Sequence, residues 1–342
     1  MALALYLAFL GAACAYALLD WRRAWFLVPL CGILQDPIRK LTPNNPVAVS
    51  FLVVILYTVI LFAGRRELIR DLGDFSARFP RVHAALFAVL LLLMVAALNG
   101  LATYGIENWK VPLLSLITYC IPVVAVLMGY TWLRREEVLL RFLNVYVVLT
   151  SVALIGTVLE YMRVPWRILG LVSMEGEWIR HLPGIQIRLL SGVYRGPDIM
   201  AWHAATLTAI AIALAIREGF GRRVLIWGGI AAWGFFNCII AGRRKAIYYV
   251  IVFMAMFLWR YFRRIRAAQI FALLGVLVIL AGVVHHFNET EESSVYTRGA
   301  LTTQGEVSQR LQGGVFETFD QFGLMGAGLG TATQGVYHLL GR

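Results

Sequence analysis

The chain has 342 residues, of which 60% are hydrophobic and only 15% are charged. A soluble domain carries about 25% charged residues, so the composition excludes a soluble single-core enzyme, a disordered chain and a disulfide scaffold. The formal net charge is +12, and lysine occurs only at positions 40, 110 and 245, so arginine supplies nearly all of the positive charge. Arginine-rich cytoplasmic loops and an anionic substrate are the two explanations of this charge, and nucleic acid is not an expected partner.

Apolar runs near 20 residues recur along the chain, which predicts an all-α, polytopic helical membrane protein with about nine to ten membrane segments. The first run follows no Lys or Arg, so we expect an uncleaved membrane helix rather than a signal peptide. The second, 24–35, is too short to cross alone and is interrupted by Pro29 and Gly32. The expected segments are 2–19, 24–35, 47–63, 83–101, 111–132, 139–161, 199–216, 222–241, 246–262 and 268–286.

The arginines between these segments predict the orientation. Four arginine-rich stretches fall on one side of the membrane when the segments between them are counted: the loops 64–82, 133–141 and 217–223, and the stretch 260–266. By the positive-inside rule that side is the cytoplasm. The loop 162–198, the turn 242–245 and the tail then face outward, although they also carry arginines. Positive charge on the outer side opposes the insertion bias, so a functional demand for it would explain these residues.

Two regions are expected along the chain. Residues 1–286 form a multi-span membrane domain that includes the outer loop 162–198. Residues 287–342 form a polar, Gly-rich tail in which apolar residues recur at helical spacing over 306–322. This pattern predicts an amphipathic helix on the outer membrane face.

The first candidate site ends the outer loop and reads Arg188-Leu-Leu-Ser-Gly192-Val-Tyr194-Arg195-Gly-Pro197-Asp198. Gly-Pro-Asp is typical of a helix start, with Pro early and an acid in the first turn. Two arginines seven residues apart at a helix N-terminus can bracket an anion. The alternative is a capping turn whose arginines extend to the membrane interface. His203 follows one turn into the next segment and would line the same cavity.

The second candidate site is the turn Gly242-Arg243-Arg244-Lys245, which is too short to leave the membrane surface. An Arg near mid-membrane costs about 2.5–3.5 kcal/mol, and a diphosphate would offset that cost through charge-assisted hydrogen bonds. The alternative is a topology signal, which conflicts with the side that the neighbouring loops assign to this turn.

The third candidate site lies in the tail. Arg310 and Leu311 precede three glycines, Gly326, Gly328 and Gly330, and His338 follows. No strand precedes these glycines, so dinucleotide binding is not expected. His338 is a candidate general base because its ordinary pKa is near 6.5, and the alternative is a bystander histidine. Adjacent His285 and His286 would point about 100° apart on a helix, so no metal site is expected.

In this order, and with these segments between them, the three motifs resemble the O-antigen ligase and O-antigen polymerase superfamily. The stretch from Gln35 to Lys40 is also similar to some exopolysaccharide polymerases. The chain departs from the family where Asp198 replaces Asn and where Leu339 replaces the Asn after the histidine, and it ends early relative to the family. The residues that carry the resemblance are Arg188, Gly192, Tyr194, Pro197, Asp198, Gly242, Arg243, Arg244, Arg310, Leu311, Gly326, Gly328, Gly330 and His338.

The resemblance implies a C-type glycosyltransferase fold and a metal-independent glycosyltransferase that needs no cofactor and serves polysaccharide biosynthesis. The donor would be a glycan on a polyprenyl diphosphate such as undecaprenyl diphosphate, and the acceptor a glycan or a lipid. The implied place is the inner (plasma) membrane with the active face outward, periplasmic in a Gram-negative cell, among membrane lipid and polysaccharide export or assembly proteins. Arg188, Arg243 and Arg244 would stabilise the diphosphate leaving group, and His338 would take the acceptor's proton. The implied substrate-binding residues are Tyr194, Arg195, Asp198, His203 and Arg310.

Two other classes remain open. A flippase or transporter of a lipid-linked anionic glycan could use the same arginines, but it should show charges at mid-membrane and an inverted repeat. The expected segments hold almost no such charge apart from Glu160 near the end of one of them. In a non-catalytic membrane subunit of a polysaccharide assembly complex, the arginines would serve docking or topology.

Overall fold

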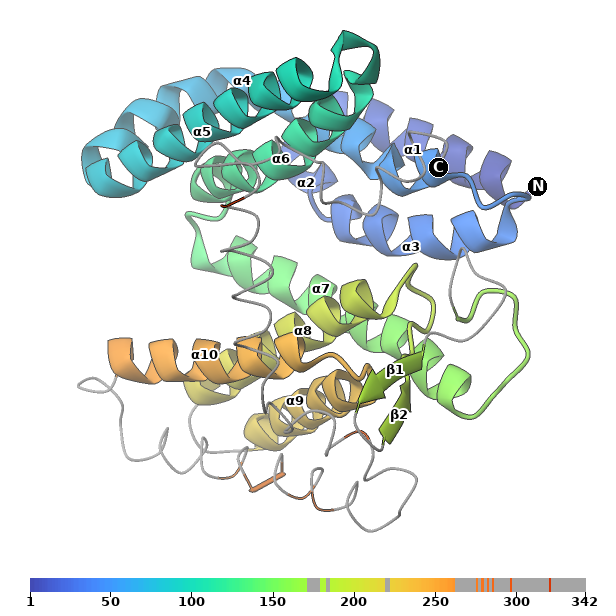
Figure 1. Ribbon diagram of the computed structural model, residues 1–342. Coiled ribbons are helices and arrows are strands. Elements are labelled where there is room, and N and C mark those ends of the chain that lie inside the picture. The colour runs from blue at the N-terminus through green and yellow to red at the C-terminus, as the bar shows by residue number, and fades with distance from the viewer. Residues whose placement is uncertain are drawn as a thin grey trace. The chain divides into compact units, whose positions relative to one another are not determined.

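The computed structural model describes residues 1–170, 179–182, 185–218 and 222–261, and the single positions 275, 278, 279, 282, 285, 296 and 320. The chain divides into two compact units. One comprises residues 1–63 and 140–302, and the other comprises 64–139 and 303–342. Helices dominate the described residues, and Figure 1 labels them in chain order.

Seven of the ten expected segments are confirmed as helices long and apolar enough to cross a membrane. α10 (Arg244–Tyr261) is also helical, but its 18 residues include three cations, which leaves it outside this set. The segment expected at 268–286 lies outside the described residues except for five single positions. The seven are α1 (Ala2–Leu19), α4 (Leu52–Arg78, preceded by the 3-10 helix η1, Val47–Phe51), α5 (Pro80–Tyr104), α6 (Lys110–Trp132), α7 (Glu136–Tyr161), α8 (Pro197–Glu218) and α9 (Arg222–Ile240).

The expected short segment at 24–35 is occupied by α2 (Trp21–Ala24) and α3 (Leu27–Leu41). The 15 residues of α3 rise about 22 Å at 1.5 Å each, which is less than the ~30 Å hydrocarbon core of a bilayer. Its second half buries Asp36, Arg39 and Lys40. α3 is therefore a helix packed within its unit rather than a membrane span.

The expected loop at 64–82 is wrong. α4 continues to Arg78, Phe79 alone breaks the helix, and α5 begins at Pro80. A helix persists wherever its backbone bonds are made, and the residues after Ala63 are mostly good helix formers with i,i+4 charge pairs such as Asp74 and Arg78. The break falls at Phe79 because proline disfavours helical geometry in the residue before it.

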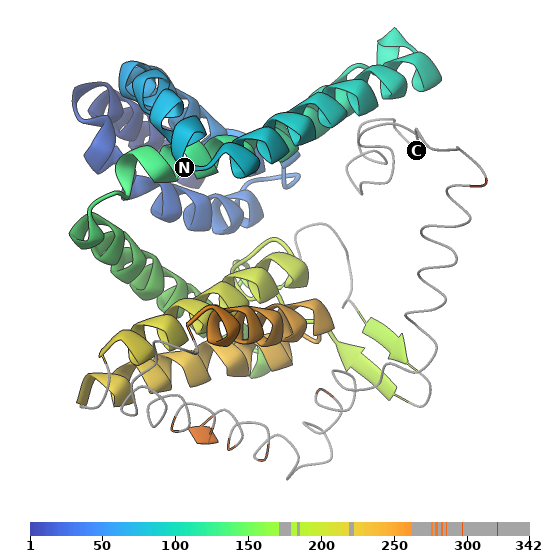
Figure 2. The ribbon, with the colours of Figure 1, turned by 90° about the vertical axis from the view of Figure 1, so that its left-hand side faces the viewer.

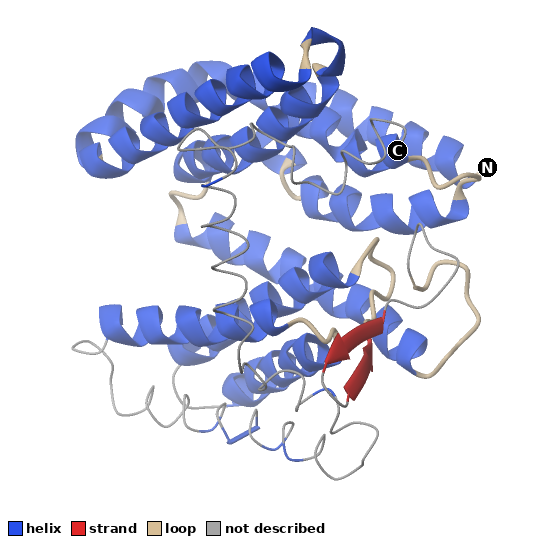
Figure 3. Ribbon diagram, in the orientation of Figure 1, coloured by secondary structure: helices blue, strands red, loops and turns tan. Residues whose placement is uncertain are grey.

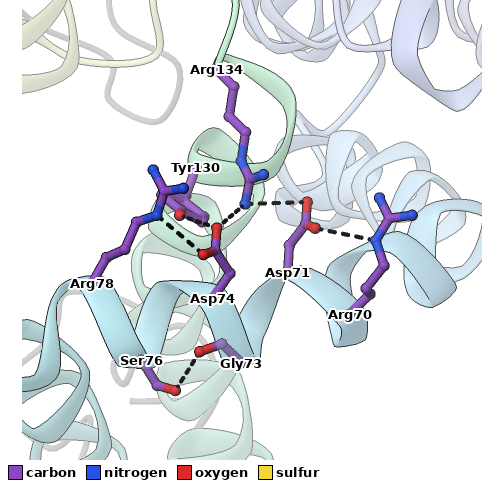
Figure 4. Close-up of polar contacts among 8 residues, drawn as sticks. All are labelled: Arg70, Asp71, Gly73, Asp74, Ser76, Arg78, Tyr130 and Arg134. Carbon is purple, nitrogen blue, oxygen red and sulfur yellow. Dashed lines mark hydrogen bonds and ion pairs between the residues drawn. The ribbon is translucent and has the colours of Figure 1, made fainter.

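In the second unit a polar network joins α4 to α6 (Figure 4). The Asp74 carboxylate accepts hydrogen bonds from the Tyr130 hydroxyl at 2.7 Å, Arg134 at 2.8 Å and Arg78 at 3.1 Å. Arg134 also lies 3.7 Å from Asp71 and stands over the Tyr130 ring, 4.5 Å from its centroid. Acidic residues of α4 thus pair with arginines for which the sequence predicted only one role, that of marking the cytoplasmic side.

In the first unit α8 lies beside α9 and α10, as Figures 1 and 2 show. Small residues permit this close packing: Ala204, Ala205 and Ala211 of α8 are fully buried. A Cβ added at Gly234 of α9 would lie 2.5 Å from Thr208 Oγ1 and 2.9 Å from the Ala204 carbonyl oxygen. Helices in membranes approach through such small residues because lipid supplies no hydrophobic drive between them.

The loop between α7 and α8 contains a β-hairpin that an all-α expectation does not include (Figure 3). β1 (Ile179–Leu182) pairs antiparallel with β2 (Ile185–Arg188), with Ile179 opposite Arg188. β2 alternates apolar and polar residues, the pattern of a half-buried strand. Ile187 is buried against Ile239 and Ile240 at the end of α9, so the hairpin is fixed to the helices of its unit.

Candidate functional site

The residues 189–196, here called the Gly192 turn, connect β2 to α8 and carry most of the first predicted motif. From α7, the Glu160 carboxylate accepts hydrogen bonds from the backbone N–H groups of Ser191, at 2.8 Å, and Gly192. Gly192 has φ +58°, and a Cβ there would lie 2.7 Å from the Thr157 nitrogen. Glycine is required at this position because the conformation and the contact with α7 both exclude a side chain.

The Gly192 turn is held from α3 as well. The Lys40 ammonium donates to the Gly192 carbonyl oxygen at 2.8 Å, and the Arg195 N–H donates to the Asp36 carboxylate at 3.1 Å. Asp36 and Lys40 are four residues apart and therefore lie on the same face of α3. Both residues are buried, with exposed fractions of 2% and 6%. Their charged groups therefore bind the Gly192 carbonyl oxygen and the Arg195 N–H away from solvent.

Burial governs the titration of these groups. It raises the pKa of Asp36, against the opposing charges of Arg195 and Lys40 and the hydrogen bond from the Arg195 N–H. Burial lowers the pKa of Lys40 to about 8, although the charges of Glu160 and Asp36 oppose the shift. Burial, with smaller contributions from Tyr146 and Asp36, holds the pKa of Tyr194 well above its ordinary value. Tyr194 is therefore a neutral hydroxyl at physiological pH.

Two of the predicted substrate-binding residues are neighbours. The Tyr194 ring stacks on the His203 ring with centroids 4.8 Å apart and planes 19° from parallel. The Nδ1 atom of His203 lies 2.9 Å from the hydroxyl of Tyr146, so α7 orients this histidine. Tyr194 is almost fully buried, and it connects the Gly192 turn to the interior of the helix bundle rather than presenting an open surface.

The first and second predicted motifs meet. The residues 241–243, here called the Arg243 turn, connect α9 to α10, as expected. The Arg243 guanidinium lies 3.0 Å from the carboxylate of Asp198, in the first turn of α8. A Cβ at Gly242 would lie 2.6 Å from the Leu189 side chain, so the Arg243 turn also packs on the Gly192 turn. Motifs more than 40 residues apart thus form one cationic region at the start of α8.

The remaining predicted residues differ in position. Arg244 opens α10 and is buried, with 8% of its surface exposed. Arg188 ends β2, where its carbonyl oxygen accepts a hydrogen bond from the Tyr296 hydroxyl at 2.9 Å. Arg195 is partly buried in the Gly192 turn. The third motif, with Arg310, the glycines 326, 328 and 330 and His338, lies outside the described residues, as does the amphipathic helix expected over 306–322 apart from the single position 320.

Sequence reasoning missed the roles of Asp36, Lys40 and Glu160. Asp36 and Lys40 belong to the stretch that is similar to exopolysaccharide polymerases, and Glu160 is the one acid in the expected apolar segment 139–161. Charges in apolar surroundings were the signal that could have placed them at the site.

The described residues contain no group of three His, Cys, Asp or Glu side chains that could hold a metal ion. Comparison of the chain with family models, curated proteins and solved structures found no match.

Proposed function

We propose that this protein is a membrane-embedded glycosyltransferase that moves or polymerises a glycan from a polyprenyl-diphosphate donor at the outer leaflet. The observation that carries the proposal is the meeting of the Arg243 turn with the start of α8, where Arg243 lies 3.0 Å from Asp198. This region lies at the ends of long apolar helices, where the headgroup of a lipid-linked donor would be found. Guanidinium groups recognise phosphate oxygens in a bidentate manner, which suits them to a diphosphate.

In the proposed reaction the acceptor hydroxyl oxygen forms a bond to the anomeric carbon of the donor glycan. The bond from that carbon to the diphosphate oxygen breaks, and the diphosphate leaves with the electron pair. Arg243 would stabilise the developing negative charge, with Arg188 and Arg244 contributing, and the N-terminus of α8 adds partial positive charge. The acceptor's proton would pass to a base, for which His338 remains the candidate. The arginines provide the positive charge, so no cofactor takes part in the proposed mechanism.

The remaining residues of the first motif would bind substrate. Arg195 follows Tyr194 in the Gly192 turn, so it can contact the same anionic donor from a second direction. His203 would contact the glycan with the buried Tyr194 ring stacked behind it, and Asp198 would hold the Arg243 side chain in place. The acceptor would be a glycan or a lipid, and polysaccharide export or assembly proteins would be partners in the plasma membrane.

The test is a turnover assay on the purified chain in lipid. A polyprenyl-diphosphate-linked oligosaccharide and candidate acceptors are supplied without nucleotide sugar, and release of polyprenyl diphosphate and transfer of glycan are followed. A single transfer would identify a ligase and a ladder of products a polymerase. Movement of the lipid across the bilayer without release would instead support a flippase. Binding without either would support a non-catalytic subunit.

A further inference from the structure

α3 is tied to its neighbours at both ends. Near its start, the Tyr6 hydroxyl of α1 donates to the Cys31 carbonyl oxygen at 3.0 Å. Near its end, Arg39 donates to the Asn45 carbonyl oxygen at 3.0 Å and to the Ser50 hydroxyl at 3.2 Å. A helix anchored in this way can act as a fixed support for whatever its remaining face contacts.

That remaining face contacts the Gly192 turn. Three backbone N–H groups of the turn, those of Ser191, Gly192 and Arg195, donate to buried carboxylates of α7 and α3. The Gly192 carbonyl oxygen accepts from Lys40 and also from the Gly170 N–H at 3.1 Å. Charged side chains from two helices thus determine the backbone path on both sides of Tyr194.

This arrangement is costly for stability. Each buried charge loses hydration, and replacing buried ion pairs by apolar residues is often neutral or stabilising. Within the described part of the chain, Gln35 Oε1, Asp36 Oδ1 and Ser191 Oγ are buried without a hydrogen-bond partner, which adds a further penalty. A turn that only had to be stable would not need these groups, so their effect is on conformation.

We infer that Asp36, Lys40 and Glu160 are positioning residues, which hold the Gly192 turn in the one conformation that keeps Tyr194 stacked on His203 and places Arg195 for the substrate. The conformational part of this inference depends only on the contacts above. The substrate part rests on the proposed function. The three residues act through the turn and need not contact the donor or the acceptor.

Hydrogen–deuterium exchange tests the conformational part without any substrate. The full chain in lipid nanodiscs is compared as wild type, Lys40→Met, Asp36→Asn and Lys40→Arg. We expect exchange at the amides of residues 191, 192 and 195 to rise about tenfold or more in Lys40→Met and Asp36→Asn, with α5 unchanged. Lys40→Arg keeps the charge and the donors and should restore protection. Lys110→Met, the same substitution at an exposed lysine, is the matched control.

Unchanged exchange at these amides in both Lys40→Met and Asp36→Asn would overturn the inference, whatever the activity. If Lys40→Met does not fold, Asp36→Asn and Lys40→Arg give the same comparison. In the transfer assay, positioning predicts that Lys40→Met lowers kcat at least tenfold with KM nearly unchanged, and that Lys40→Arg recovers most of it. A wild type without transfer activity would refute the proposed function and leave the exchange result standing.

Discussion

Arg243 and Asp198 form an ion pair of 3.0 Å between the Arg243 turn and the first turn of α8. The side chains are partly exposed, at 24% and 46%, so solvent screens the pair and its intrinsic contribution to stability is small. Its importance lies in geometry, because it brings together two motifs that are separate in sequence. It also places a carboxylate of the protein where the proposed function places the diphosphate of the substrate.

Asp198→Asn should therefore tighten binding of an anionic donor. Asn keeps an oxygen that can accept a hydrogen bond from Arg243, but it removes the negative charge that competes with diphosphate. An exposed pair is worth about 0.2–1 kcal/mol, so we expect the apparent Kd of a polyprenyl diphosphate to fall up to about fivefold. Binding titrations of wild type and variant measure this, and weaker binding by the variant would show that the Asp198 charge aids the donor.

Gly192→Ala should destabilise the fold. The positive φ of +58° and the 2.7 Å approach of a Cβ to the Thr157 nitrogen both oppose a side chain. Strain of this kind costs about 1–3 kcal/mol, which should appear as a lower thermal unfolding temperature. Gly196→Ala is the control in the same turn, because a Cβ there meets nothing within 4 Å. Equal unfolding temperatures for the two variants would contradict the described turn.

The sequence predicted the features that depend on local pattern. Continuous apolar runs marked seven helices, and Gly-Pro-Asp marked the start of α8 at Pro197. The prediction of a loop at 64–82 was wrong because a segment that is no longer apolar can still be helical. The network around the Gly192 turn was out of reach, because Lys40 and Gly192 are 152 residues apart and no local pattern pairs them. The β-hairpin was missed because its strands have only four residues each.

The titration of Lys40 should make stability depend on pH in a defined direction. Its pKa in the folded chain is about 8, below the ordinary value of 10.5. Between these values the unfolded chain binds a proton that the folded chain does not, so the free energy of unfolding rises with pH over this interval. The charges that act on the pKa of Lys40 are those of Glu160 and Asp36. Arg195 and Arg39 in turn act on the pKa of Asp36.

Unfolding temperatures from pH 7 to 10.5 check this prediction on wild type and Lys40→Met. The difference between the two proteins should shift in favour of wild type as the pH rises above about 8. A difference that stays constant, or that shifts in favour of the variant, would mean that the buried lysine keeps its ordinary affinity for protons.

Asp74→Ala should weaken the contact between α4 and α6 in a salt-dependent way. The variant loses the bonds from Tyr130, Arg78 and Arg134 together and leaves the two arginines to repel each other. Exposed charges are screened as the Debye length shortens, from about 10 Å at 0.1 M salt to about 3 Å at 1 M. The loss of thermal stability should thus be larger at low salt. Asp20→Ala is the control, because it removes one exposed pair with Arg23 together with the bond that caps α2, and brings no two arginines into repulsion.

Under the proposed function, Arg243 stabilises a diphosphate leaving group during glycan transfer. The most direct measurement is the turnover assay with lipid-diphosphate-linked oligosaccharide on wild type, Arg243→Ala, Arg243→Lys and the control Arg260→Ala. We expect wild type and Arg260→Ala to transfer glycan and release polyprenyl diphosphate. Arg243→Ala should lose about 10²-fold or more in kcat, and Arg243→Lys should recover only part because it lacks the bidentate geometry. Transfer by Arg243→Ala at the wild-type rate, with all proteins folded, would contradict the account.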